Sequence, residues 1–228
     1  MLSLFPGIGL LDKGFEEEGF TVVRGPDLLW GGDIRRFHVP AGKFDGLIGG
    51  PPCQAFSRAS RIGGTCAVDL IPEFVRVFRE ARPAWVVMEN VVQAVGHPDI
   101  PDDWFPCILR DWDCGGETSR TRAFWTWPFA VMQPCRTPGE PEHTVMATTW
   151  KRGGVGSRYV RDKCFLPGDF PIEEYARLQG APEVGRTLQE YRAGRAFIVH
   201  VLGNGVPLAM GRYIAGAVKR ALEFDDGR

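Results

Sequence analysis

Several features that define other protein classes are missing from this chain of 228 residues. Its 27 basic side chains nearly balance its 28 acidic ones, so it carries no overall charge that would attract a polyanion. Any contact with nucleic acid must therefore come from local basic patches. No apolar run approaches the length of a membrane-spanning helix, so we expect no membrane association.

The cysteines lack any metal-binding or disulfide pattern. There are six, with no C-x-x-C pair and no histidine at the spacing of a zinc site, so we expect no metal. The apolar start, Met1 to Leu11, lacks the basic segment of a secretory signal and contains Pro6 and two glycines. Unpaired thiols without a leader predict a cytoplasmic protein.

One short stretch dominates the sequence, and it runs from Gly49 to Ser57 as Gly-Gly-Pro-Pro-Cys-Gln-Ala-Phe-Ser. It follows a strand-like run, Phe44 to Ile48. The glycines let the chain leave that strand sharply, and the prolines fix the backbone just before Cys53. A buried core cysteine is the alternative, but the polar neighbours Gln54 and Ser57 favour a nucleophile.

The N-terminal third predicts the opening of a doubly wound α/β sheet. Leu2 to Phe5 reads as a strand, residues 6–9 as a turn, Leu10 to Gly19 as a helix and Phe20 to Val23 as a second strand. Gly7 and Gly9 allow the backbone to approach a ligand.

The same region argues against a dinucleotide cofactor. Asp12 stands where a dinucleotide fingerprint needs its third glycine, so a cofactor without a pyrophosphate fits better than NAD. Asp27 follows the second strand and is placed to accept hydrogen bonds from ribose hydroxyls, with a solvated turn aspartate as the alternative.

Acidic and basic candidates follow two later strands. A helix over Asp69 to Glu80 precedes the strand Trp85 to Met88, which delivers Glu89 to the sheet edge that holds Cys53. Glu89 is either a helix cap or an acid, and a pocket of low dielectric would raise its pKa. We expect residues 96–117 to form a loop with a short helix.

A further strand, Ser119 to Trp127, alternates polar and apolar residues and places Arg120 and Arg122 on one face. Such arginines are either solvated or clamps for an anion or a carbonyl group. Near a catalytic pocket, we favour the clamps.

The region from Pro128 to Pro171 differs from the rest in its proline, glycine, threonine and arginine content. Its centre, Trp150 to Arg161, is either a surface loop or a site for phosphate contacts and base stacking. The candidate contacts are Lys151, Arg152, Arg158 and Arg161.

The C-terminal part predicts two helices, Glu173 to Gln179 and Leu208 to Phe224, with a turn at residues 203–207. Gly211 and Gly216 in the second helix indicate close packing against another element.

In their order, these motifs resemble those of the cytosine-C5 DNA methyltransferases over nearly the whole chain. The matching segments are Leu4 to Gly9, Gly49 to Ser57, Glu89-Asn90-Val91, the pair Arg120 and Arg122, Arg177 to Gly180, and Gly203 to Pro207. The resemblance implies a class I S-adenosylmethionine-dependent fold, a Rossmann-like doubly wound mixed α/β sheet with a small irregular insertion. Residues 1–129 and 169–228 would form the catalytic domain, and 130–168 a reduced target-recognition insertion.

The resemblance also implies roles for individual residues. Cys53 would add to C6 of a flipped cytosine, Glu89 would bind N3 and the amine, Arg122 would bind O2, and Arg120 would support the cysteine loop. Gln54 and Ser57 would contact DNA around the flipped base. S-adenosylmethionine would be held by Phe5, Gly7, Gly9, Asp27, Asp33, Ile34, Pro51, Asn204 and Val206.

Three departures from the family pattern bear on the substrate. Thr118 replaces a usual glutamine, the usual helix between Asp27 and Asp33 is missing, and the segment between Phe129 and Phe170 is too short for a sizeable recognition domain. Short or relaxed specificity on duplex DNA is the favoured interpretation. The alternatives are the same chemistry on a mononucleotide or RNA, a silent binding subunit, and an enzyme whose recognition part is a separate chain.

Overall fold

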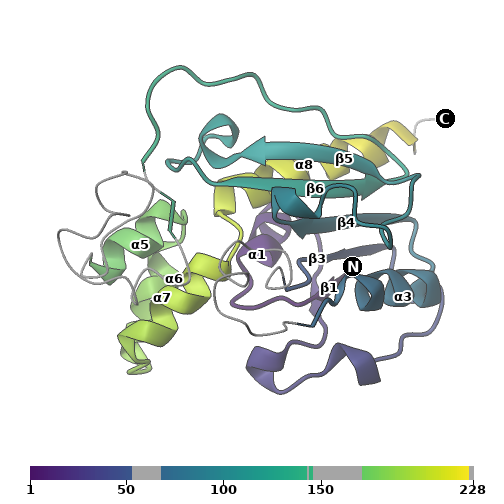
Figure 1. The fold of residues 1–228 in the computed structure, drawn as a ribbon, viewed down its shortest axis with the longest axis horizontal. Helices are drawn as coiled ribbons and strands as arrows, with labels where there is room; N and C mark the ends of the chain where they lie inside the picture. The colour runs from purple at the N-terminus through teal and green to yellow at the C-terminus, as the bar shows by residue number, and fades with distance from the viewer. Residues whose placement is uncertain (53–67, 143, 146–170, 226–228) are drawn as a thin grey trace.

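A mixed sheet of strands in the order β2-β1-β3-β4-β6-β5 forms the centre of the part that the computed structural model describes, residues 1–52, 68–142, 144–145 and 171–225 (Figure 1). The first four strands run parallel, whereas β6 is antiparallel to both β4 and β5. The strands are β1 (Leu2–Leu4), β2 (Val23–Arg24), β3 (Gly46–Gly49), β4 (Trp85–Asn90), β5 (Phe105–Arg110) and β6 (Thr121–Trp127).

Helices cover both faces of this sheet, which confirms the predicted doubly wound α/β architecture. Helix α3 (Ile71–Ala81) shares one core with β1 and β3, whereas α1 (Leu10–Glu17) and α8 (Leu208–Asp225) belong to a second core. A third cluster joins α5 (Ile172–Leu178), α6 (Pro182–Glu190) and α7 (Arg195–Asn204), which lie together at the left of Figure 1. Short 3₁₀ helices are η1 (Leu28–Trp30), η2 (Ile34–Arg36), η4 (Val92–Ala94) and η5 (Asp111–Cys114).

Strand β4 shows why the sequence forms a central strand. Its side chains alternate between the two cores, with Val86 and Met88 in the α3 layer and Trp85 and Val87 in the α1–α8 layer. A strand that is buried on both faces has a continuous apolar sequence. In β4 this apolar run ends at Glu89.

The structure corrects the predicted second strand. It spans Val23–Arg24 rather than Phe20 to Val23. The ring of Phe20 instead packs edge-on against Phe15 and Trp85, with centroids 5.3 and 5.6 Å away. Because the Phe20 ring packs in this aromatic cluster, residue 20 is not part of the sheet, and the strand begins at Val23.

Residues 96–117 contain the expected loops and a short helix, η5, but also a strand that was not expected, β5. Pro106 argued against a strand here, because proline occurs in sheets mainly on edge strands. The structure shows that β5 is such an edge strand. Helices α6 and α7 were not expected from the sequence pattern. No helix of the described residues is long and apolar enough to cross a membrane.

The close packing predicted for Gly211 occurs at a crossing of α1 and α8. A Cβ built on Gly14 would lie 2.5 Å from the carbonyl carbon of Gly211, which belongs to the backbone and cannot rotate away. A Cβ built on Gly216, by contrast, would have as its nearest neighbour the end of the Arg220 side chain, at 3.3 Å.

This difference gives a test of the crossing. Gly14→Ala is expected to lower the free energy of unfolding by about 1–3 kcal/mol, because the helices must separate. Gly216→Ala is the control, and its better helix propensity should leave stability unchanged or raise it by up to about 1 kcal/mol. Urea titrations of both variants would measure this, and equal stabilities would contradict the crossing.

Candidate functional site

A cavity of about 590 Å³ opens at the carboxyl ends of β1, β3 and β4. Open α/β sheets bind ligands at this edge, so the topology alone makes this cavity the candidate site. The turn after β1, the Gly50–Pro52 segment after β3 and Glu89 at the end of β4 all line it, together with the C-terminal end of α7.

Glu89 and Arg122 form an ion pair in this cavity, with 2.9 Å between Oε1 and Nε. They meet because β4 and β6 are antiparallel neighbours in which Glu89 lies opposite Phe124, two residues along from Arg122. The Glu89 side chain is 11% exposed. Burial raises the pKa of this carboxyl, while the charges of Arg122 and Arg120 oppose the rise.

Gly50 is required by the position of the Glu89 carboxyl group. A Cβ at residue 50 would lie 2.6 Å from Oε2 of Glu89. The second glycine of the Gly-Gly-Pro-Pro segment therefore lets the carboxyl group lie directly against the backbone that leads to Cys53.

Arg120 is buried and also lines the cavity. It donates to the carbonyl oxygens of Val145, at 2.7 Å, and Gly203, at 2.8 Å. These bonds join the start of β6 to the end of α7, next to the predicted cofactor residue Asn204. The role expected for Arg120, support of the cysteine loop, stays a prediction.

Asn90 holds the backbone of the proline segment. Its Nδ2 donates to the carbonyl oxygen of Pro51 at 3.1 Å, and its Oδ1 accepts from the N–H of Val91 at 2.8 Å. Cys53, Gln54 and Ser57 follow directly but lie outside the described residues, as do Lys151, Arg152, Arg158 and Arg161.

Most of the predicted cofactor residues meet in the cavity. Those that line it are Phe5, Gly7, Asp27, Pro51, Asn204 and Val206. Three others do not belong to its lining: Gly9, Asp33 and Ile34.

Their contacts explain this placement. Gly9 begins α1 with φ of 79°, and a Cβ there would lie 2.5 Å from the Arg24 guanidinium. Asp33 pairs with Arg35, at 2.7 Å, and this partner lowers the pKa of Asp33 to about 2. Ile34 packs in the α3 core.

Sequence reasoning missed a buried acid beside the cavity. Asp12 accepts from the Ser3 hydroxyl at 2.5 Å and from Arg24 Nε at 2.9 Å. Burial raises its pKa, and both partners oppose the rise. The network ties α1 to β1 and β2, and Asp12 was noticed only as a missing glycine.

Two residues of α7 also reach the cavity side by side. His200 Nε2 and Asn204 Nδ2 are 3.0 Å apart, one helical turn from each other. His200 was not among the predicted residues, because no helix was expected there. Its position four residues before Asn204 could have indicated that the two side chains lie on the same face of a helix.

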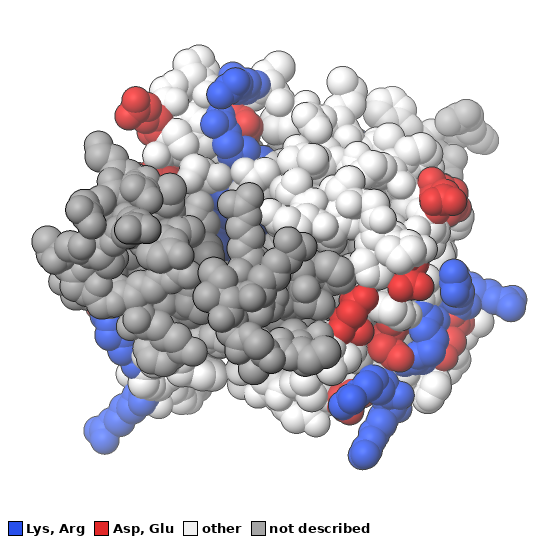
Figure 2. Space-filling view, in the orientation of Figure 1, with Lys and Arg blue, Asp and Glu red and all other residues white. Residues whose placement is uncertain are grey.

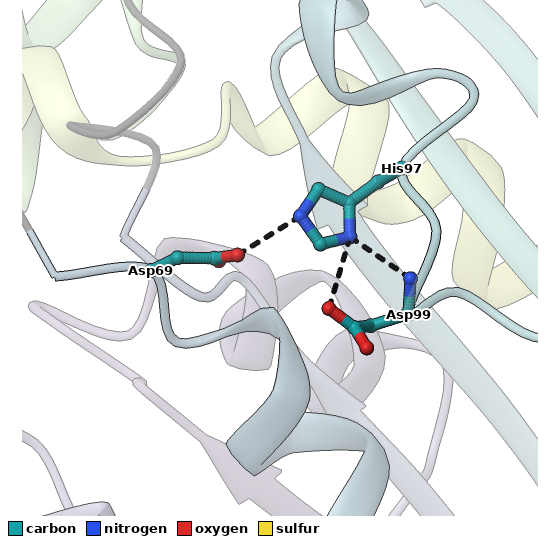
Figure 3. Close-up of side chains that lie close together, drawn as sticks. All are labelled: Asp69, His97 and Asp99. Carbon is teal, nitrogen blue, oxygen red and sulfur yellow. Dashed lines mark hydrogen bonds and ion pairs between the residues drawn. The ribbon is translucent and has the colours of Figure 1, made fainter.

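Asp69, His97 and Asp99 lie close together near the start of α3 (Figure 3). The backbone N–H of Asp99 donates to His97 Nδ1 at 3.2 Å, which assigns the ring proton to Nε2, 2.9 Å from Asp69 Oδ2. The other oxygen of Asp69 accepts from the Ile71 N–H at 3.0 Å. The group thus fastens the first turn of α3 to the loop after β4.

Comparison with known proteins is consistent with this site. Residues 31–102 match the family described as C-5 cytosine-specific DNA methylase. Type II methyltransferase M.HgiGI of Herpetosiphon aurantiacus is 34% identical over 115 residues, covering 41% of this chain and 90% of that protein. M.NgoPII of Neisseria gonorrhoeae is 32% identical over 111 residues, covering 40% of this chain but 33% of that protein.

The matches span less than two thirds of several of these relatives. With M1.HphI of Haemophilus parahaemolyticus, 64 residues are 48% identical, covering 26% of this chain and 17% of that protein.

Two solved structures share the fold. Entamoeba histolytica methyltransferase EhMeth has a TM-score of 0.63 at 13% identity, covering 97% of this chain and 98% of that one. The Dnmt2 methyltransferase of S. pombe has a TM-score of 0.60 at 14% identity, covering 96% of this chain and 98% of that one. The predicted class I methyltransferase fold is confirmed.

Proposed function

Because the chain belongs to the C-5 cytosine-specific DNA methylase family, we propose that it transfers a methyl group from S-adenosylmethionine to C5 of cytosine in DNA. One observation supports this most directly. The Glu89–Arg122 pair lies against Gly50, in the same cavity as the glycine turn after β1. The proposed acid, the proposed base-binding arginine and the proposed cofactor turn therefore line one cavity.

The residues of the cavity fit S-adenosylmethionine. The volume of about 590 Å³ lies within the range of small-ligand sites. A Cβ at Gly7 would meet nothing within 4 Å, so the turn leaves open space above its backbone. Phe5, Gly7, Asp27, Asn204 and Val206 would hold the cofactor, which supplies an electrophilic methyl group on its sulfonium sulfur.

The protein's own groups would then make C5 of the ring nucleophilic. The Cys53 thiolate would form a bond to C6, and the displaced electron pair of the C5–C6 double bond would move toward N3 and O2. Protonated Glu89 would donate to N3, and Arg122 would stabilise charge on O2. After C5 has taken the methyl group, its proton would pass to a water molecule and Cys53 would leave as the thiolate, which restores the C5–C6 double bond. The proton on N3 would return to Glu89.

A cytosine within a duplex cannot reach such an enclosed site, so we propose that the base is flipped out of the DNA. The described surface carries mixed charges. In Figure 2, acidic and basic side chains lie next to each other along the rim of this face. We therefore propose that DNA contacts depend on the 130–168 insertion, with short or relaxed specificity, or on a separate recognition chain.

Transfer of label from methyl-labelled S-adenosylmethionine tests this function. Duplex DNA, single-stranded DNA, RNA and dCMP would be compared under the same conditions. Label in cytosine of DNA is the expected result. Label in RNA or dCMP alone would contradict the DNA assignment, and the short insertion would then be a cover for a smaller substrate. Cofactor binding without transfer to any of them would favour a missing partner chain.

A further inference from the structure

The turn between β1 and α1 has a strained backbone, closed by one internal hydrogen bond from the Gly9 N–H to the Pro6 carbonyl at 2.8 Å. Phe5 has φ of 55°, a left-handed conformation that is costly for a residue with a side chain. Gly7 and Gly9 follow with φ of 56° and 79°. All of this turn except Gly9 lines the cavity, so its shape determines the cofactor site.

The turn is held from outside by the segment around η1. The N–H of Phe5 donates to the Pro26 carbonyl at 3.2 Å. The N–H of Gly7 donates to Asp27 Oδ2 at 2.8 Å, and the indole Nε1 of Trp30 donates to the Gly7 carbonyl at 2.7 Å. Both polar groups of Gly7 are thus bound by side chains of one short segment.

Neither side chain is explained by core packing. Trp30 is 65% exposed, so its ring contributes little buried apolar surface. The other oxygen of Asp27 accepts from the Leu29 N–H at 2.7 Å and so fixes the η1 turn that carries Trp30. The exposed indole is therefore kept in place for its hydrogen bond.

We propose that Trp30, together with Asp27, is a positioning residue that sets the Gly7 peptide groups for cofactor binding. The inference rests on the proposed function. It also adds to the expectation for Asp27. Each of its carboxylate oxygens accepts a backbone N–H, so Asp27 shapes the cofactor site through Gly7 in addition to any direct contact with the ribose.

Three variants separate the hydrogen bond from the ring. Trp30→Phe keeps an aromatic ring but removes the N–H, and Trp30→Ala removes both. Trp112→Phe is a matched control, because its Nε1 also donates to a backbone carbonyl, that of Thr137, at 3.2 Å, and Trp112 does not line the cavity. The dissociation constant of S-adenosylmethionine would be measured by calorimetry on each full-length chain.

Trp30→Phe and Trp30→Ala are both expected to weaken binding by about 3- to 10-fold, the loss of one hydrogen bond. Trp112→Phe should bind as the unaltered protein does. The KM for S-adenosylmethionine should rise in the Trp30 variants while kcat at saturation is kept, and the Tm without cofactor should fall no further in Trp30→Phe than in Trp112→Phe, which also loses one hydrogen bond.

Two results would overturn this inference but not the proposed function. One is that Trp30→Phe binds S-adenosylmethionine as tightly as the unaltered protein. The other is a loss of binding confined to Trp30→Ala, which would assign the effect to the ring. Absence of cofactor binding by the unaltered protein would overturn the proposed function as well.

Discussion

Cys53→Ser is expected to reduce methyl transfer to cytosine on the order of 10⁴-fold or more, the scale of losing an enzyme nucleophile. A thiol with a pKa near 8.5 supplies some thiolate at neutral pH, whereas a serine hydroxyl does not ionise there. The residue follows Pro51 and Pro52 directly, and the carbonyl of Pro51 is held by Asn90. The backbone that leads toward Cys53 is therefore held at Pro51.

The measurement combines label transfer with detection of a covalent complex on DNA that contains 5-fluorocytosine. Fluorine at C5 cannot leave as a cation, so the adduct with Cys53 should accumulate. The control is Cys135→Ser, which removes an exposed free thiol elsewhere in the chain. Transfer that survived in Cys53→Ser, or that was lost equally in Cys135→Ser, would contradict a nucleophilic role for Cys53.

The parts of the site that follow strands could be predicted from sequence. Glu89 follows a run that is buried on both faces, and parallel strands end at a common edge. That rule places Glu89 near the segment after β3 without knowledge of any contact. The position of Arg122 follows from the alternation of β6, and Arg120 lies directly before that strand. Both line the cavity.

The parts that depend on tertiary contacts could not be predicted. The packing of the Ile34 side chain in the α3 core is one such contact, and the cofactor role expected for Ile34 stays a prediction. Asp33 is engaged by Arg35, two residues away. Trp30 becomes relevant only because the chain folds back so that its indole reaches Gly7. Hydrophobic periodicity in the sequence cannot predict such a contact.

Glu89→Gln is expected to reduce kcat by about 10²–10⁴-fold, the usual contribution of a positioned acid. Glutamine keeps the size of the side chain and can still accept from Arg122 Nε, but it cannot supply an acidic proton to the ring. The carboxyl group is in place to do so, because Oε1 faces Arg122 and Oε2 lies over Gly50. Glu190→Gln, at the exposed end of α6, is the control.

The pH dependence should identify Glu89 as the group responsible. Burial raises its pKa, so the active protonated form persists above the usual range of a glutamate and is lost as pH rises through the raised value. The same shift means that a contribution to folding stability is fully present below the pKa of the unfolded state and is lost as pH rises through that of the folded state.

In Glu89→Gln, both the fall of kcat with rising pH and this loss of stability should disappear. Profiles of kcat and of the free energy of unfolding for both proteins test this directly. A falling limb that persisted in Glu89→Gln would assign the proton to another group, whereas its loss without a loss of rate would leave Glu89 as a titrating neighbour rather than the acid.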